Sequence, residues 1–128
     1  MTEPTWVTAA MVRVIHERLT DEHGSRAGLR DAGLLASAIA RPRNAMAYGE
    51  PAIPQLAASL AFGIARNHPF IDGNKRVALM AAYVFLGLNG LRLIANEAEA
   101  TAMVVELAAG ESSEEEFAAW IAAAVEPR

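Results

Sequence analysis

Apolar residues recur at helical spacing along most of this chain, with polar loops between the apolar stretches. From Thr8 to about His23 they fall at i, i+4, i+7 and i+8, which predicts one apolar face of a first helix. A similar face of leucine, isoleucine and alanine predicts a second helix over residues 30–40, which the pair Arg41-Pro42 is expected to end. The first part of the chain therefore predicts two helices joined by a glycine-containing loop.

Residues 42–53 carry neither helical nor strand periodicity. Pro42, Gly49 and Pro51 interrupt this stretch, so it is expected to form a surface flap rather than a helix. A loop of this length inside a small domain is more often functional than not. The flap is therefore a candidate functional segment.

Four more helices and one short extended piece are expected after the flap. In order, they are a helix from Pro54 to Asn67, an uncharged helix over residues 77–88, an extended piece over residues 91–95, a helix after the cap Asn96 and a helix after the cap Ser113. The uncharged helix is the fourth in the chain and has no polar face, so we expect it to lie at the centre. The predicted fold is an all-α, compact six-helix bundle around this buried helix, with a flap loop.

Length and charge narrow the possible classes of protein. At 128 residues the chain is expected to form a single domain over residues 1–128. A net charge of −4 argues against a broad nucleic-acid surface, so no direct contact with nucleic acid is expected. The chain has no cysteine, no evident signal peptide and no apolar run long enough for a membrane span. A cytoplasmic protein without a membrane partner is therefore expected.

The candidate chemistry is concentrated in residues 67–76. Pro69 disfavours helical backbone at His68, so the third helix should end there. Gly73 and Asn74 suit a tight turn that brings backbone N–H groups close to a ligand. The uncharged helix follows directly, and a helix N-terminus with free N–H groups is a ready anion site.

The side chains of this loop suggest phosphoryl or nucleotidyl transfer. His68 offers an imidazole that can accept a proton near neutral pH, and Asp72 offers a hard oxygen ligand for Mg²⁺. Lys75 and Arg76 add positive charge where the helix begins. Each residue also has a plain structural interpretation, as a loop histidine, a helix N-terminal carboxylate and a solvated basic pair.

Other histidines and metal sites are given no functional role at this stage. His16 and His23 lack polar neighbours of this kind and are expected at the surface. No pair of ligand-type residues has zinc spacing with a third ligand in view, so no structural metal is expected.

The nine residues from His68 to Arg76, HPFIDGNKR, closely resemble the signature of the Fic/Doc family, in particular its Doc branch of toxins from toxin–antitoxin modules. Residues 28–31, 40–42, 48–50 and 85–90 also resemble that family's second helix, flap and central-helix end. The resemblance covers most of the chain, from about residue 5 to about residue 122. It implies the Fic/Doc-type helical bundle.

Two departures from the wider family pattern decide which activity the resemblance implies. Most Fic proteins transfer AMP, with glycine where this chain has Lys75 and a second arginine where it has Leu79. Doc shares both differences, so similarity to it implies an ATP- and Mg²⁺-dependent protein kinase acting on a threonine or serine hydroxyl of elongation factor Tu, which inhibits translation. A nucleotidyl (AMP) transferase and a catalytically idle helical binding module are the alternatives.

The resemblance also implies a role for each residue of the site. His68 would be the general base and Asp72 the Mg²⁺ ligand. Phosphate would be held by Arg66, Gly73, Asn74, Lys75 and Arg76, and the target chain would be registered by Arg43, Asn44 and Tyr48 of the flap through strand addition. The self-inhibitory string [S/T]-x-x-x-E-[G/N] of many Fic proteins is missing. Restraint is therefore expected from a cognate antitoxin, whose disordered C-terminal segment would fold into a groove on this chain.

Overall fold

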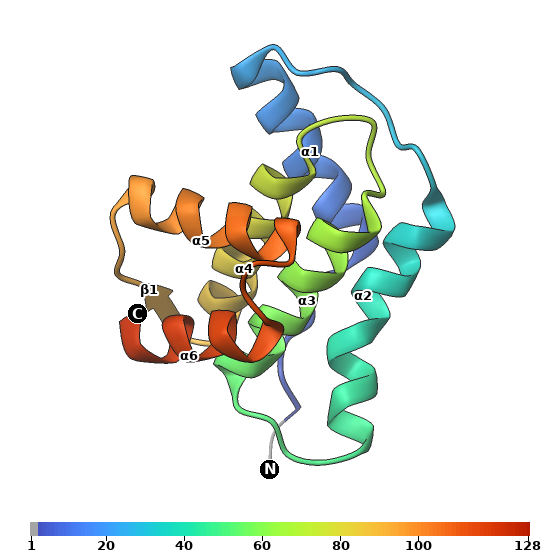
Figure 1. The fold of residues 1–128 in the computed structure, drawn as a ribbon. Coiled ribbons are helices and arrows are strands. Elements are labelled where there is room, and N and C mark those ends of the chain that lie inside the picture. Colours follow the sequence, from blue (N-terminus) through green and yellow to red (C-terminus); the bar gives the residue numbers. More distant parts are fainter. Residues whose placement is uncertain (1–2) are drawn as a thin grey trace.

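Helices make up most of the computed structural model, which describes residues 3–128 (Figure 1). The elements are α1 (Ala9–His23), α2 (Ala32–Ala47), α3 (Ile53–Asn67), α4 (Asn74–Leu88), β1 (Leu91–Leu93), α5 (Glu97–Ala109), α6 (Glu114–Ala124) and β2 (Val125–Pro127). β1 and β2 pair as one short antiparallel ribbon. The prediction of an all-α bundle is confirmed. In the described part of the chain, no helix has the length and apolarity to cross a membrane.

The helix ends follow the capping residues in the sequence. Thr8 Oγ1 accepts a hydrogen bond from the Met11 N–H at the start of α1. Asn96 and Ser113 do the same for the first turns of α5 and α6, over 2.7 and 3.0 Å. Each such cap stabilises a helix by about 1 kcal/mol, so these starts were readable from local sequence alone.

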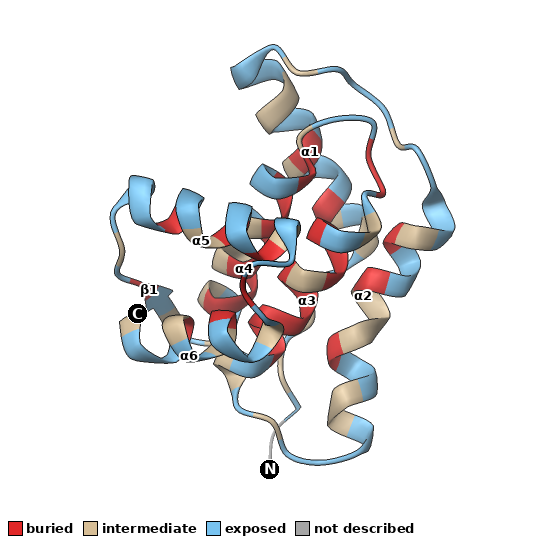
Figure 2. Ribbon diagram, viewed as in Figure 1, coloured by how far each residue is buried: buried red, intermediate tan, exposed pale blue. Residues whose placement is uncertain are grey.

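The buried centre of the bundle is α3, not α4 as predicted. Residues 56–61 of α3 are all buried, and the helix packs against α2, α4, α5 and α6 (Figure 2). α4 packs on α3 but leaves Met80 and Leu88 exposed by 37% and 39%. A stretch without charge need not be surrounded, because apolar atoms contribute much of any protein surface. In α3 the buried small residues Ala57, Ala58, Ser59 and Ala61 let neighbouring helices approach from several sides.

The expected end of the second helix at Pro42 was also wrong. α2 runs through a buried Pro42 to Ala47, so the non-helical connection to α3 shrinks to residues 48–52. Leu35, Ala38 and Pro42 are buried on one face of α2, and Ala45 and Met46 beyond the proline pack partly buried against the core. Packing along that face outweighs the cost of about 3 kcal/mol for an internal proline.

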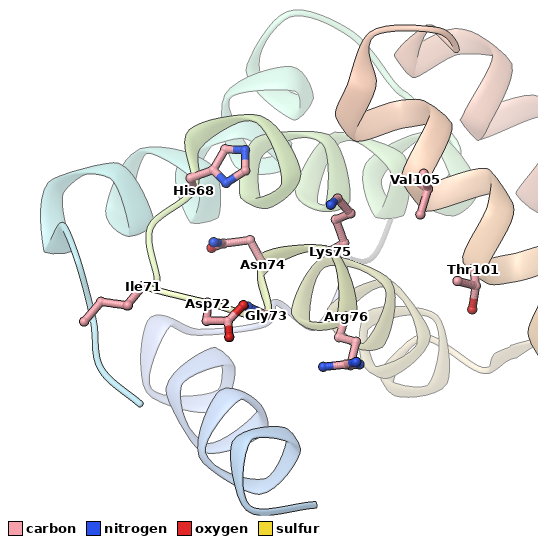
Figure 3. Close-up of a pocket in the computed structure, with 9 residues that line it drawn as sticks. All are labelled: His68, Ile71, Asp72, Gly73, Asn74, Lys75, Arg76, Thr101 and Val105. Carbon is pink, nitrogen blue, oxygen red and sulfur yellow. The ribbon is translucent and has the colours of Figure 1, made fainter. Parts of the chain in front are cut away.

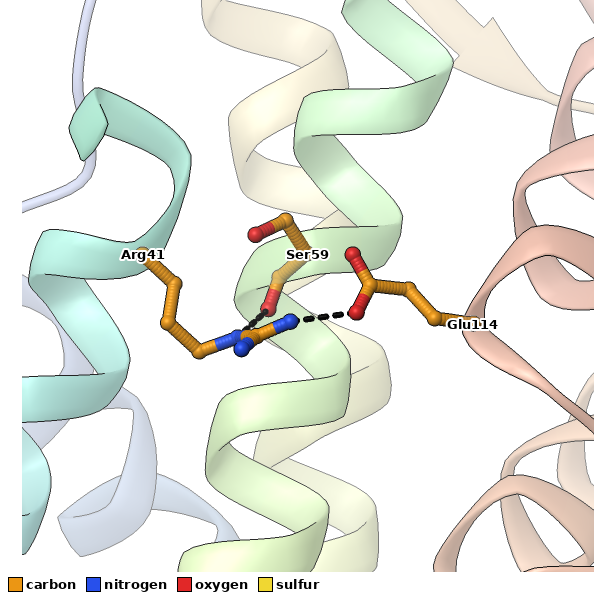
Figure 4. A network of polar contacts seen from close by, with 3 residues as sticks. All are labelled: Arg41, Ser59 and Glu114. Carbon is orange, nitrogen blue, oxygen red and sulfur yellow. Dashed lines mark hydrogen bonds and ion pairs between the residues drawn. The ribbon is translucent and has the colours of Figure 1, made fainter. Parts of the chain in front are cut away.

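Polar contacts beyond the packing face also hold α2 at Arg41, the residue before its proline. Arg41 Nε donates to the Ser59 carbonyl oxygen of α3 over 3.2 Å, and the same guanidinium is paired with Glu114 at the start of α6 (Figure 4). It also lies over the Phe62 ring, 4.9 Å from the ring centroid. One side chain from α2 thus spans α3 and reaches a third helix, a tertiary constraint that local sequence does not reveal.

Candidate active site

A cavity of about 380 Å³ lies between the loop that joins α3 to α4 and the outer side of α5 (Figure 3). Its lining residues are His68, Ile71, Asp72, Gly73, Asn74, Lys75, Arg76, Thr101 and Val105. The structure therefore brings together all site residues predicted in the loop and in the first turn of α4. The α5 residues Thr101 and Val105 had no signal in the sequence that linked them to the site.

His68 has an uncommon backbone conformation. α3 ends at Asn67, as Pro69 predicted, and His68 has φ 51° and ψ 56°. It is the one non-glycine residue with positive φ in the described chain, a conformation that costs about 1–2 kcal/mol. Contacts from elsewhere must therefore hold this backbone, and with it the direction of the imidazole.

Those contacts come from residues 28–31, just before α2. The backbone N–H groups of Arg30 and Asp31 donate to the Pro69 carbonyl oxygen over 2.7 and 3.0 Å, and Leu29 forms an isolated bridge with Phe70. The Arg30 side chain donates twice more, from Nε to the His68 carbonyl oxygen over 2.7 Å and from Nη2 to that of Asn67 over 2.9 Å. Nothing in the sequence indicated this role for Arg30, although residues 28–31 carried part of the family resemblance.

The residues predicted to dock a target do not lie at this cavity. Arg43 and Asn44 belong to the last turns of α2, and Tyr48 follows them, 92% exposed. They lie near the start of α3, whereas His68 follows its end (Figure 1). The 15 residues of α3 separate the two ends by about 22 Å at 1.5 Å per residue. The segment beside the loop between α3 and α4 is the connection between α1 and α2.

His16 was expected at the surface, and that prediction was wrong. Only 5% of it is exposed, and its ring stacks on Phe70 with 4.0 Å between centroids. Nε2 lies 2.9 Å from the carbonyl oxygen of Asp72, which can only accept, so Nε2 carries the proton and donates. His16 follows buried Val12 by one helical turn on α1, the only sequence sign that it faces inward.

Asn74 closes the loop with both ends of its side-chain amide. Nδ2 donates to the Phe70 carbonyl oxygen over 2.9 Å, and Oδ1 accepts from the Phe70 N–H over 3.0 Å. The residue is buried, with 7% exposed, so its side chain has a structural task. Gly73, with φ 78°, precedes it as the N-cap and has no side chain to occupy the helix start. The first backbone N–H groups of α4 therefore remain suited to an anion in the cavity.

Asp72 is held in its charged form. Its Oδ2 accepts from the Arg26 N–H over 3.2 Å and its Oδ1 from the Gly73 N–H over 2.8 Å. These two bonds, the one from Arg26 foremost, hold the pKa of the Asp72 carboxyl below its usual range.

One carboxylate together with nucleotide phosphates is a usual way of holding Mg²⁺. Residues 3–128 contain no cluster of three or more histidine, cysteine or acidic side chains that could hold a metal alone. The donor set at Asp72 therefore fits Mg²⁺ only in company with phosphate ligands.

Two cations flank the helix start. Lys75 and Arg76 are exposed, line the cavity, and take no part in the ion pairs between described residues. Arg66, predicted as a further phosphate ligand, does not line the cavity and lies over the Phe62 ring, 5.4 Å from its centroid. Leu79, one turn after Lys75, packs against the core. Positive charge is thus concentrated in the first turn of α4.

Comparison with known proteins finds a matching family model and named relatives. The model of the Fic/DOC family matches residues 6–86. The chain is 49% identical over 76 residues to "Toxin Doc" of Mycolicibacterium smegmatis, a match covering 57% of this chain and 58% of that protein. It is 32% identical over 100 residues to "Protein kinase doc" of Escherichia phage P1, covering 77% of this chain and 79% of that one. The chain thus matches less than two thirds of the length of the mycobacterial relative.

Proposed function

The chain belongs to the Fic/Doc family, and from this membership and the geometry of the loop we propose that it is a Doc-like toxin with protein kinase activity. In this proposal one domain over residues 1–128 transfers the γ-phosphate of ATP to a serine or threonine hydroxyl. The suspected target is elongation factor Tu, whose modification would inhibit translation in the cytoplasm. The relative named "Toxin Doc" also supports a cognate antitoxin as the restraining partner, and we propose that the C-terminal segment of this antitoxin is disordered until it binds.

The observation that carries the proposal is the pair of residues at the start of α4. Lys75 adds a flexible point charge to the cavity where AMP-transferring relatives have glycine, and core-packed Leu79 stands where they have a second arginine. A nucleotide bound with its α-phosphate in this place would lose that second guanidinium. A terminal phosphate would instead meet Lys75, Arg76 and the free N–H groups of the helix start.

The proposed reaction assigns one task to each group. His68 takes the proton of the target hydroxyl as its oxygen bonds to the γ-phosphorus, the bond to the β,γ-bridging oxygen breaks, and ADP leaves. Lys75, Arg76 and the backbone N–H groups in the first turn of α4 stabilise the charge on the transferred group, while the Gly73 N–H stays bound to Asp72 Oδ1. Mg²⁺, held by Asp72 and the phosphates, would neutralise further negative charge.

The test uses two samples of ATP, one labelled at the α-phosphate and one at the γ-phosphate. Each is incubated with the full chain and elongation factor Tu. Label from the γ-position on the factor supports the proposal, and its loss in His68→Ala supports the base. The matched control is Ile94→Ala, which removes an exposed side chain that does not line the cavity and should leave transfer unchanged.

Three outcomes would contradict part of the proposal. Label from the α-position alone would indicate a nucleotidyl transferase. γ-Label on another protein but not on the factor would retain the kinase and remove the suspected target. Growth inhibition that is unchanged in His68→Ala, without any label, would indicate an idle binding module.

A further inference from the structure

We infer that Arg30 is a positioning residue for His68, because its guanidinium fixes the left-handed backbone that carries the imidazole. The inference rests on the proposed function, in which His68 is the general base. Arg30 lies outside the cavity lining and belongs to the segment before α2, so it acts through the backbone rather than on a substrate.

The two carbonyl groups that Arg30 binds are those that flank the soft dihedral angles of His68. Nη2 donates to the Asn67 carbonyl oxygen over 2.9 Å, and Nε donates to the His68 carbonyl oxygen over 2.7 Å. Rotation about φ or ψ of His68 turns one of these carbonyls relative to the other. A guanidinium is planar and rigid, so one that bridges both carbonyls restrains both angles at once.

Without this bridge His68 has a less strained alternative. The ring of Pro69 disfavours right-handed helical backbone at His68, and its observed φ of 51° is disfavoured for any residue with a Cβ. Extended backbone satisfies both restrictions, and it points the side chain in another direction. Loss of the guanidinium should therefore release the imidazole from its place in the cavity.

The rest of the loop should remain in place when the Arg30 side chain is removed. The Pro69 carbonyl is held by the backbone N–H groups of Arg30 and Asp31, which every variant at position 30 except proline retains. Asp31 is fixed in turn as the N-cap of α2, where its Oδ1 accepts from the Leu34 N–H over 2.9 Å. A change in φ or ψ of His68 must be compensated at its neighbours, so the expected change covers residues 67–69 and ends at this anchor. That limit separates a positioning role from a general loss of fold.

The exposure of Arg30 permits chemical rescue. In Arg30→Ala, guanidinium ion added at a low, non-denaturing concentration can enter the vacated place and bind the same two carbonyls. Arg30→Lys offers a flexible ammonium group in place of the rigid, planar guanidinium and should hold the backbone only in part. Arg128→Ala is the matched control, since Arg128 Nη1 donates to a helix-end carbonyl, that of Gly87, over 2.8 Å at the other end of α4.

The first experiment records the backbone NMR signals of His68 in the full chain labelled at histidine. The chain has three histidines, two of which lie in α1, so His68 is readily distinguished. In Arg30→Ala the ¹³Cα and ¹Hα shifts of His68 should move from left-handed toward extended values, and guanidinium should reverse this. Arg128→Ala should leave them unchanged. His68 shifts that stay at the wild-type value in Arg30→Ala would overturn the inference.

The second experiment measures phosphate transfer. Arg30→Ala should lower kcat by about 10- to 100-fold with little change in the KM for ATP, because misplacement of a catalytic group affects the chemical step. Guanidinium should restore part of kcat. A fall that guanidinium does not restore, in a variant that remains folded, would overturn the inference.

Failure of the proposed function would be recognised separately. Full transfer by His68→Ala would remove His68 as the base, while the NMR shifts would still report whether Arg30 holds its backbone. If Arg30→Ala does not fold, Arg30→Lys takes its place, with intermediate His68 shifts expected and wild-type shifts overturning the inference.

Discussion

Nε2 of His16 donates to the backbone carbonyl oxygen of Asp72 over 2.9 Å, which ties α1 to the loop between α3 and α4. The His16 ring also stacks on Phe70 of the same loop, with an angle of 11° between the ring planes. Two histidines therefore contribute to this loop. His68 lines the cavity, and His16 holds the loop against α1.

Substituting His16 separates the hydrogen bond from the stacking. His16→Phe keeps an aromatic ring against Phe70 but leaves the Asp72 carbonyl without its donor, so we expect a loss of about 1–3 kcal/mol in the free energy of unfolding. Urea denaturation measures this loss. His23→Phe, at an exposed position of the same helix, should change stability by less than about 0.5 kcal/mol. Equal stabilities of the two variants would contradict a bracing role.

Gly63 sets the distance between α2 and α3. A Cβ built at Gly63 would lie 2.8 Å from Arg41 Cδ and 2.9 Å from the backbone Cα of Ala38, closer than van der Waals contact allows. Gly63→Ala should therefore destabilise the protein by about 1–3 kcal/mol through overpacking. Gly49→Ala is the control, because nothing lies within 4 Å of a Cβ at that position. A neutral Gly63→Ala in thermal denaturation would indicate that α2 moves away at no cost.

Asn74 offers a test between a structural and a phosphate-binding role. Asn74→Ala removes both side-chain bonds to the backbone of Phe70, which is itself only 1% exposed. Two unpaired backbone groups should cost about 2 kcal/mol or more of unfolding free energy, in the absence of any ligand. A variant with wild-type stability and weakened nucleotide binding would instead favour the phosphate-binding role.

The sequence predicted the backbone of the loop between α3 and α4 better than the contacts that hold this loop. Pro69 disfavours helical backbone at the residue before it, and Gly73 readily adopts a positive φ. Both effects are local, so the end of α3 and the start of α4 could be predicted from the sequence. His16 and Arg30 donate to carbonyl groups that are distant in sequence, and folding alone brings these acceptors close to them. Pro42 failed as a helix stop for the same reason, because the contacts that overrule it come from other helices.

The lowered pKa of Asp72 makes a prediction about acid stability. A carboxyl whose pKa is lower in the folded than in the unfolded state stabilises the fold above its unfolded pKa, and the gain is lost as pH falls through the folded pKa. The stability difference between wild type and Asp72→Asn should therefore stay constant from neutral pH to about pH 5 and shrink below about pH 4. Urea denaturation across that range measures it. A difference that disappears between pH 7 and pH 5 would contradict the assigned cause, which is the pair of N–H donors from Arg26 and Gly73.

If the terminal phosphate of ATP lies at the start of α4, Lys75 should stabilise the charge on the phosphate that is transferred. Lys75→Ala removes one of the two side-chain cations that line the cavity and leaves Arg76 and the helix N–H groups in place. Loss of one preorganised charge at a developing transition state commonly costs about 10²–10³ in turnover, and we expect a fall in kcat of that order for γ-phosphate transfer. Lys75 is exposed, so stability should change little, and denaturation of the same variant serves as the control. Lys75→Arg retains the charge and should keep most of the activity. Wild-type γ-transfer by Lys75→Ala would mean that the charge replacing the family's glycine does not bind the reacting phosphate, and the choice between phosphate and AMP transfer would then have to depend on Leu79.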